Sequence, residues 1–86
     1  MSGEAMSVEA RVIDTIRTLL ARYGRGVPVT AQSRLYADGL GLDSLAAAEL
    51  STMLEMAFGR DPYSDGMVPR SVEEIVRFYE TPAGSR

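Results

Sequence analysis

Three segments of this chain combine a chemically marked helix start with apolar residues at helical spacing, and together they predict a helical fold. Ser7 can cap the first helix, because its hydroxyl can accept from a backbone N–H that has no partner inside the helix. Gly24 can take the left-handed conformation that closes this helix after Tyr23. The apolar residues of the segment are Val8, Val12, Ile16, Leu19, Leu20 and Tyr23.

The second helix is expected to begin at Asp43, whose carboxylate can cap it, and to end at about Phe58, before Gly59. Successive residues of a helix are about 100° apart, so the side chains of this segment divide between two faces. The face that we expect to enter the core consists of Ala47, Leu50, Leu54, Ala57 and Phe58.

The last helix has a complete set of start signals. Ser71 and Glu74 fit a capping box, in which each side chain accepts from the other residue's backbone N–H. An apolar stripe follows, so we expect a short helix that ends near Glu80. The residues of the stripe are Val72, Ile75, Val76 and Tyr79.

Two connections complete the predicted fold. Residues 24–42 contain five glycine or proline residues and no sustained periodicity, which predicts a long first loop with a functional role or, alternatively, a plain linker. Asp61 followed by Pro62 resembles a cap and a first helical position, which predicts one short helix before Gly66. We therefore expect an all-α, four-helix bundle of three main helices and one short helix.

Composition excludes several classes of function. The chain has 86 residues and neither histidine nor cysteine, which excludes a histidine-dependent triad, a cysteine nucleophile and the usual zinc sites. Its net charge of −3 disfavours binding to the phosphate backbone of nucleic acids. No stretch has the roughly 18 apolar residues that span a bilayer. We expect a cytoplasmic protein with one folded domain at residues 7–80, flexible ends at 1–6 and 81–86, and no nucleic acid or membrane partner.

The most informative motif is Leu-Gly-Leu-Asp-Ser-Leu at residues 40–45. It resembles the Gly-x-Asp-Ser-Leu signature with which acyl carrier proteins begin their second helix. The resemblance covers about residues 7–80 and includes Tyr36 before the serine and Phe58 after it. It implies an acyl-carrier-like bundle in which Ser44 receives 4'-phosphopantetheine from coenzyme A, through a phosphopantetheinyl transferase. Asp43 would support this modification.

The position of Ser44 also fits this chemistry on physical grounds. A serine in the first turn of a helix is exposed, and the free N–H groups and helix dipole there favour a phosphate. An Asp-Ser pair before an alanine-rich helix is also an ordinary helix start, so the motif alone leaves open a purely structural serine. Its place in a short acidic chain, after one helix and a long loop, favours the carrier.

The outward face of the second helix combines apolar residues with acidic neighbours. Solvated helix faces are normally more polar, so we interpret this surface as a partner-docking face. The alternative is that its apolar side chains contact the loop or the last helix. The predicted docking face consists of Leu45, Ala48, Glu49, Thr52, Glu55 and Met56.

The second helix departs from the acidic carriers of fatty-acid synthesis at Ala46, Met56 and Ala57. The departure favours a discrete, monomeric and non-catalytic carrier of polyketide, antibiotic or related biosynthesis, which holds acyl groups as thioesters. Its implied partners are the transferase and an acyltransferase, ketosynthase or acyl-activating ligase. Two alternatives stay open: an aminoacyl or peptidyl carrier of the nonribosomal type, which often has glycine where this chain has Leu42, and an unmodified helical adaptor.

Overall fold

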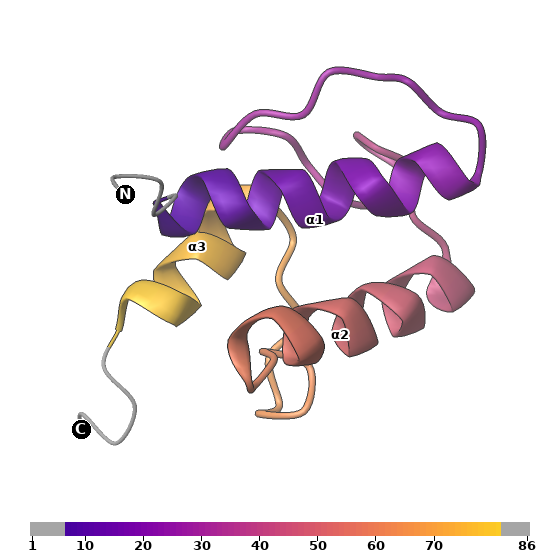
Figure 1. The fold of residues 1–86 in the computed structure, drawn as a ribbon. Coiled ribbons are helices and arrows are strands. Elements are labelled where there is room, and N and C mark those ends of the chain that lie inside the picture. The colour runs from indigo at the N-terminus through magenta and orange to yellow at the C-terminus, as the bar shows by residue number, and fades with distance from the viewer. Residues whose placement is uncertain (1–6, 82–86) are drawn as a thin grey trace.

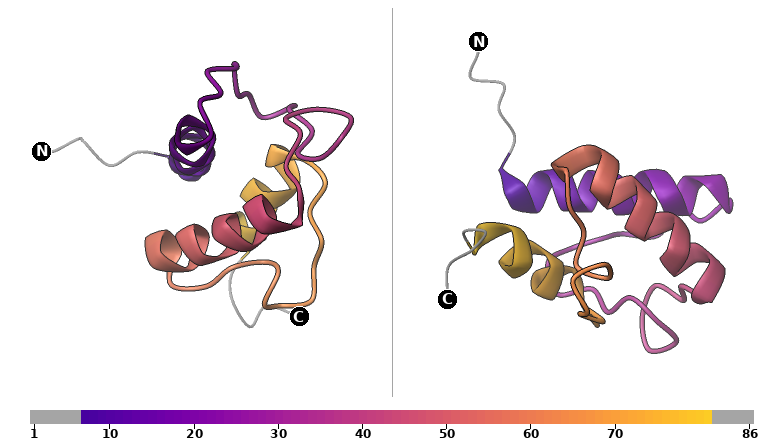
Figure 2. Two further views of the ribbon diagram at one scale, coloured as in Figure 1. Left: turned by 90° about the vertical axis from the view of Figure 1, so that its right-hand side faces the viewer. Right: turned by 90° about the horizontal axis from the view of Figure 1, so that it is seen from below.

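The computed structural model describes residues 7–81, and within this range it contains three helices and no strand. α1 spans Val8–Arg22, α2 spans Ser44–Phe58 and α3 spans Val72–Glu80. α1 packs against both other helices, and the connection to α2 runs back along the length of α1 (Figure 1). Figure 2 shows α2 and α3 on one side of α1. This all-helical architecture confirms the predicted fold class, while the ends at 1–6 and 82–86 lie outside the described residues.

Each helix begins at the residue that the sequence marks as its cap. Each cap side chain accepts from the backbone N–H three residues further on, at 3.1 Å for Ser7, 2.9 Å for Asp43 and 3.3 Å for Ser71. Gly59 closes α2 in the left-handed conformation, with φ of 87°, and its N–H donates to the carbonyl of Glu55. Local capping chemistry therefore sets the helix boundaries.

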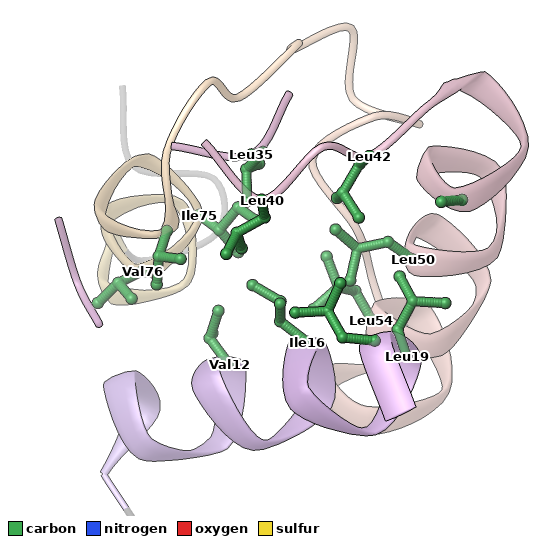
Figure 3. Packing of buried hydrophobic residues seen from close by; sticks show 13 residues of the cluster. Val12, Ile16, Leu19, Leu35, Leu40, Leu42, Leu50, Leu54, Ile75 and Val76 are labelled. Carbon is green, nitrogen blue, oxygen red and sulfur yellow. The ribbon is translucent and has the colours of Figure 1, made fainter. Parts of the chain in front are cut away.

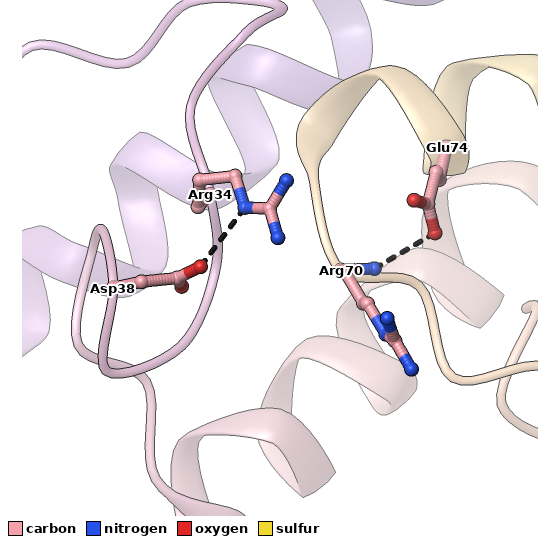
Figure 4. A network of polar contacts seen from close by, with 4 residues as sticks. All are labelled: Arg34, Asp38, Arg70 and Glu74. Carbon is pink, nitrogen blue, oxygen red and sulfur yellow. Dashed lines mark hydrogen bonds and ion pairs between the residues drawn. The ribbon is translucent and has the colours of Figure 1, made fainter.

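The capping box of α3 differs from the prediction in one hydrogen bond. The carboxylate of Glu74 accepts from the N–H of Arg70 at 2.9 Å, not from the N–H of Ser71 (Figure 4). Ser71 has an extended backbone, with φ of −144° and ψ of 164°, and pairs with the first loop. The carboxylate of Glu74 therefore accepts from the N–H of Arg70, one residue before the predicted donor, Ser71.

The pairing between the first loop and the start of α3 is a short piece of β-structure. Residues 33–35 lie beside residues 70–72, with an antiparallel bridge between Arg34 and Ser71. Two backbone hydrogen bonds of 2.9 and 3.0 Å flank this bridge. Arg34 also forms an exposed ion pair of 3.0 Å with Asp38 (Figure 4). The first loop is thus fixed to the bundle near its middle.

The short helix predicted before Gly66 is not formed, and a turn takes its place at residues 62–66. Asp61 caps this turn as expected, since its carboxylate accepts from the N–H of Ser64 at 3.1 Å and from its hydroxyl at 2.8 Å. The carbonyl of Pro62 then accepts from the N–H of Met67. Because Gly66 reverses the chain, with φ of 88°, too few residues remain for a helix.

Asp61 is a buried charged residue, only 2% exposed. Burial raises the pKa of its carboxyl, but hydrogen bonds from Ser64, together with those from Ser51 and Tyr63, outweigh burial and hold this pKa below its ordinary value. Next to it, the hydroxyls of Tyr63 and Tyr36 lie 2.7 Å apart, and burial raises the pKa of Tyr63. The turn therefore keeps the carboxylate of Asp61 charged and the hydroxyl of Tyr63 neutral at ordinary pH.

The hydrophobic core lies between the helices and the first loop (Figure 3). Of the five α2 residues predicted to face it, Leu50 and Leu54 are fully buried, two are partly buried, and Ala57 is exposed. Ala46 is buried in its place. α2 is apolar around much of its circumference, so periodicity defines its inward side poorly. The core residues are Val12, Ile16, Leu19, Leu20, Leu35, Leu40, Leu42, Ala46, Leu50, Leu54, Val72, Ile75 and Val76.

Aromatic stacking joins the far end of α2 to the other two helices. The ring of Phe58 stacks on that of Tyr79, with centroids 4.0 Å apart and planes at 16°. The guanidinium carbon of Arg11, on α1, lies 4.2 Å from the centroid of the Phe58 ring. The Tyr79 hydroxyl donates to the carbonyl of Arg60 at 2.7 Å. All three helices therefore meet at the end of α2 opposite Ser44.

Candidate functional site

Ser44 is the first residue of α2, and its side chain is exposed to solvent. Its hydroxyl forms no hydrogen bond with another described residue, so the oxygen is free to react. Asp43 precedes it in an extended conformation, with φ of −100° and ψ of −174°, and its Oδ1 is engaged by the N–H of Ala46. The structure thus places the predicted attachment serine and its acidic neighbour together at an open helix start.

The helix start offers hydrogen-bond donors for a phosphate. The N–H groups of Ser44 and Leu45 come too early in α2 to have an acceptor within the helix, and they lie at the positive end of its dipole. A phosphodiester on the Ser44 oxygen would carry a negative charge next to these donors. The residues present therefore fit a covalently attached phosphopantetheine group.

The segment before Ser44 is fixed by hydrogen bonds to the first loop and to the side chain of Arg25. Leu42 is buried, and its N–H donates to the carbonyl of Leu35 at 2.9 Å. Gly41 has φ of 79°, a conformation that favours glycine, and a Cβ there would lie 2.8 Å from Nη1 of Arg25. That Nη1 donates to the carbonyls of Leu40 at 2.8 Å and Gly41 at 3.2 Å. The side chain of Arg25 therefore ties the end of α1 to the loop that presents Ser44.

Arg25 is a site residue that the sequence did not reveal. It lies in the predicted loop, 15 residues from the nearer of its two carbonyl partners. An arginine in a polar loop has no local pattern that marks it as a loop anchor. The fold gives it this role, because it brings the carbonyls of Leu40 and Gly41 within reach of one guanidinium nitrogen.

The predicted docking face is exposed for most of its length. Leu45 is 63% exposed and Met56 is 81% exposed, so neither is covered by the loop or the last helix. Glu49 is only partly exposed, because the Tyr23 hydroxyl donates to its Oε1 at 2.8 Å. This hydrogen bond raises the pKa of the Tyr23 hydroxyl. The side chain of Tyr23 is 43% exposed, although its spacing in the sequence placed it among the apolar residues of the first helix. The exposed members are Leu45, Ala48, Thr52, Glu55 and Met56.

Residues 7–81 contain neither a membrane-spanning helix nor a cluster of metal-ligating side chains. No helix in this range is long and apolar enough to cross a membrane. No group of three or more acidic side chains in the same range could hold a metal ion.

Comparison with known proteins assigns the family. Residues 10–78 match the family described as the phosphopantetheine attachment site, a match that includes Ser44 and most of each helix. No curated protein and no solved structure matched the chain. Domains of this family carry covalent 4'-phosphopantetheine and interact with phosphopantetheinyl transferases and with the enzymes of their pathways. The match covers well over half of the chain, which therefore belongs to the phosphopantetheine attachment family, as expected for an acyl carrier protein.

Proposed function

We propose that this chain is an acyl carrier protein and that Ser44 is its attachment residue. The observation that carries the proposal is the exposed hydroxyl at the start of α2, which bonds to no other residue that the structure describes and lies within the matched family region. In the attachment step, Oγ of Ser44 bonds to the β-phosphorus of coenzyme A. The bond to 3',5'-adenosine bisphosphate breaks, and the hydroxyl proton passes to a base of the transferase. Asp43 supports this step by fixing the helix start beside the serine.

The attached arm ends in a thiol, which holds an acyl group as a thioester. A tether of this kind presents its cargo to a docked enzyme at high effective concentration. The chain acts as the substrate of the transferase and as a shuttle, and its side chains catalyse no step themselves. We assign it to a polyketide or related specialised pathway, because the docking face presents Leu45 and Met56 with only two acidic residues, Glu49 and Glu55.

Intact mass spectrometry tests the attachment directly. After incubation with coenzyme A and a broad-specificity transferase, we expect a mass increase of one 4'-phosphopantetheine group, and peptide mapping should find it on Ser44. An unchanged mass would leave an unmodified helical adaptor. Identification of the native thioester on protein from its producer would separate an acyl carrier from an aminoacyl or peptidyl carrier.

Reversing the charges of the docking face is expected to slow modification. Glu49→Arg with Glu55→Arg should lower kcat/KM of the transferase by on the order of tenfold at low salt, because the resemblance to acyl carrier proteins implies a transferase that presents a basic surface to this helix. The matched control is Glu9→Arg with Glu80→Arg, which changes the net charge equally on exposed positions of α1 and α3. Equal slowing of both double variants would contradict the docking face, because net charge alone would then explain the effect.

A further inference from the structure

The side chain of Arg25 joins two parts of the molecule that are distant in the sequence, the end of α1 and the loop before Ser44. These parts lie at the same end of the molecule (Figure 1), and a hollow of about 30 Å³ between them is bordered by Arg25, Gly41 and Asp43. Arg25 therefore lies beside the residue that caps α2, immediately before the attachment serine.

The backbone of Arg25 is fixed to α1. Its N–H donates to the carbonyl of Leu20 at 3.0 Å, and the N–H of Gly24 donates to the carbonyl of Ala21 at 3.1 Å. Gly24 has φ of 72°, so the two bonds form the motif in which a left-handed glycine closes a helix. The side chain of Arg25 thus starts from a defined position, and a substitution that keeps the backbone N–H preserves this motif.

The loop before Ser44 contains two carbonyls that need a donor from elsewhere. The N–H groups of residues 39–42 all donate to carbonyls of residues 34–36. In contrast, no backbone N–H of the described residues donates to the carbonyl of Leu40 or of Gly41, whereas Nη1 of Arg25 donates to both. The bond to Leu40 is partly buried, where a carbonyl without a donor is costly. The guanidinium therefore stabilises this conformation of the loop over more open ones.

We propose that Arg25 is a positioning residue for the attachment of phosphopantetheine, because it holds the loop in the conformation that presents Ser44. Transfer requires Oγ of Ser44 to meet the phosphorus of coenzyme A in one geometry. A carrier whose loop samples other conformations binds productively less often, which raises its apparent dissociation constant. No hydrogen bond joins Arg25 to Ser44 within residues 7–81, so the effect passes through the loop. This inference rests on the proposed attachment at Ser44.

The charge of Arg25 makes the direction of the effect informative. Replacing this arginine by glutamine makes the net charge one unit more negative than −3. The resemblance to acyl carrier proteins implies a basic docking surface on the transferase, so the charge change alone should strengthen association and speed up modification. Loss of a positioning contact should instead slow modification. The two explanations therefore predict opposite effects.

Steady-state kinetics of the transferase with the unmodified carrier as the varied substrate test the proposal. At saturating coenzyme A, Arg25→Gln should raise KM for the carrier by about tenfold, the effect expected when a hydrogen bond from a charged donor is lost. The turnover number kcat should stay within about twofold, because the loop has the required conformation in the productive complex.

Arg17→Gln is the matched control. It removes the same charge from an exposed residue of α1 that borders a surface hollow together with Arg25. Within the described part of the chain, the side chain of Arg17 forms no hydrogen bond with the loop before Ser44. KM for Arg17→Gln should therefore equal that of the wild type or fall below it.

Hydrogen exchange separates positioning from general destabilisation. In unmodified Arg25→Gln, the amides of Gly41 and Leu42, which bond to carbonyls of the first loop, should exchange about tenfold faster than in the wild type. The amides of Ile16 and Leu50, two fully buried residues, should keep their wild-type rates. Equal acceleration of all four amides would mean that the whole domain is destabilised, which would contradict a positioning role.

Three kinetic results would overturn the inference while attachment stands. They are an unchanged or lower KM for Arg25→Gln, an equal rise in KM for Arg17→Gln, and a fall in kcat at unchanged KM. The last result would mean that Arg25 acts on the reacting groups and not on the loop. A wild-type chain that gains no phosphopantetheine would instead refute the attachment at Ser44, and this inference with it.

Discussion

Replacing Ser44 by alanine is expected to abolish phosphopantetheinylation completely and to leave the helical fold intact. The substitution removes the oxygen that would bond to phosphorus, whereas the side chain contributes no hydrogen bond to another described residue. Alanine also has a higher helix propensity than serine. Intact mass after transferase treatment measures the first effect, and chemical denaturation measures the second.

A second serine at a helix start provides a matched control for Ser44. Ser71 caps α3, and its hydroxyl accepts from the N–H of Glu74. Ser71→Ala should lower the free energy of unfolding by about 1 kcal/mol, the usual cost of a lost cap, and should still accept one phosphopantetheine group. If Ser44→Ala gained the same mass as the wild type, attachment would occur at another hydroxyl and the assignment would be wrong.

Replacing Leu54 by alanine is expected to destabilise the protein by about 2–5 kcal/mol, the range for a large-to-small substitution at a buried leucine. Leu54 is 0% exposed and packs in the core between the helices (Figure 3). A small domain is stable by only about 5–15 kcal/mol, so the loss is a large fraction of the total. Urea denaturation of the wild type and the variant measures the difference.

Leu45→Ala is the matched control, because it makes the same leucine-to-alanine change at an exposed position of α2. Leu45 is 63% exposed, so Leu45→Ala should alter the free energy of unfolding by less than about 0.5 kcal/mol. Comparable losses for the two variants would show that Leu45 is buried in solution. Such a result would contradict both the exposed docking face and the orientation of α2.

The helix boundaries could be predicted because they depend on local chemistry. Ser7, Asp43 and Ser71 each cap the helix that the sequence assigned to them. The same signal was misleading at Asp61, where a real cap is followed by only four residues before Gly66 reverses the chain. A capping residue marks where a helix can start, but the length of chain after it decides whether one forms.

The orientation of α2 could be predicted only in part. Leu50 and Leu54 identify the core side, but Ala57, which was predicted to face the core, is exposed, and Ala46, which was assigned to neither face, is buried. Alanine is small enough to be tolerated on either face, so its position carries little information about burial. The correct rotation follows from packing against α1, which the α2 sequence does not contain.

The candidate site shows the same division between local and distant information. Ser44 and Asp43 were identified from adjacent residues, because helix-start chemistry is contained in a few positions. The guanidinium of Arg25 and the hydroxyl of Tyr23 reach the site from the end of α1, through contacts with Gly41 and Glu49. Contacts between residues this far apart in the sequence depend on the tertiary fold, so no local sequence pattern predicts them.

The β-bridge between the first loop and the start of α3 links two distant parts of the chain mechanically. Residues 33–35 bond to residues 70–72, and the carbonyl of Leu35 also accepts from the N–H of Leu42, two positions before Ser44. Local unfolding of either segment removes the hydrogen-bond partners of the other. We therefore expect the start of α3 and the loop segment that precedes Ser44 to open and close as one cooperative unit, although Ser44 itself, the first residue of α2, lies outside that bridge.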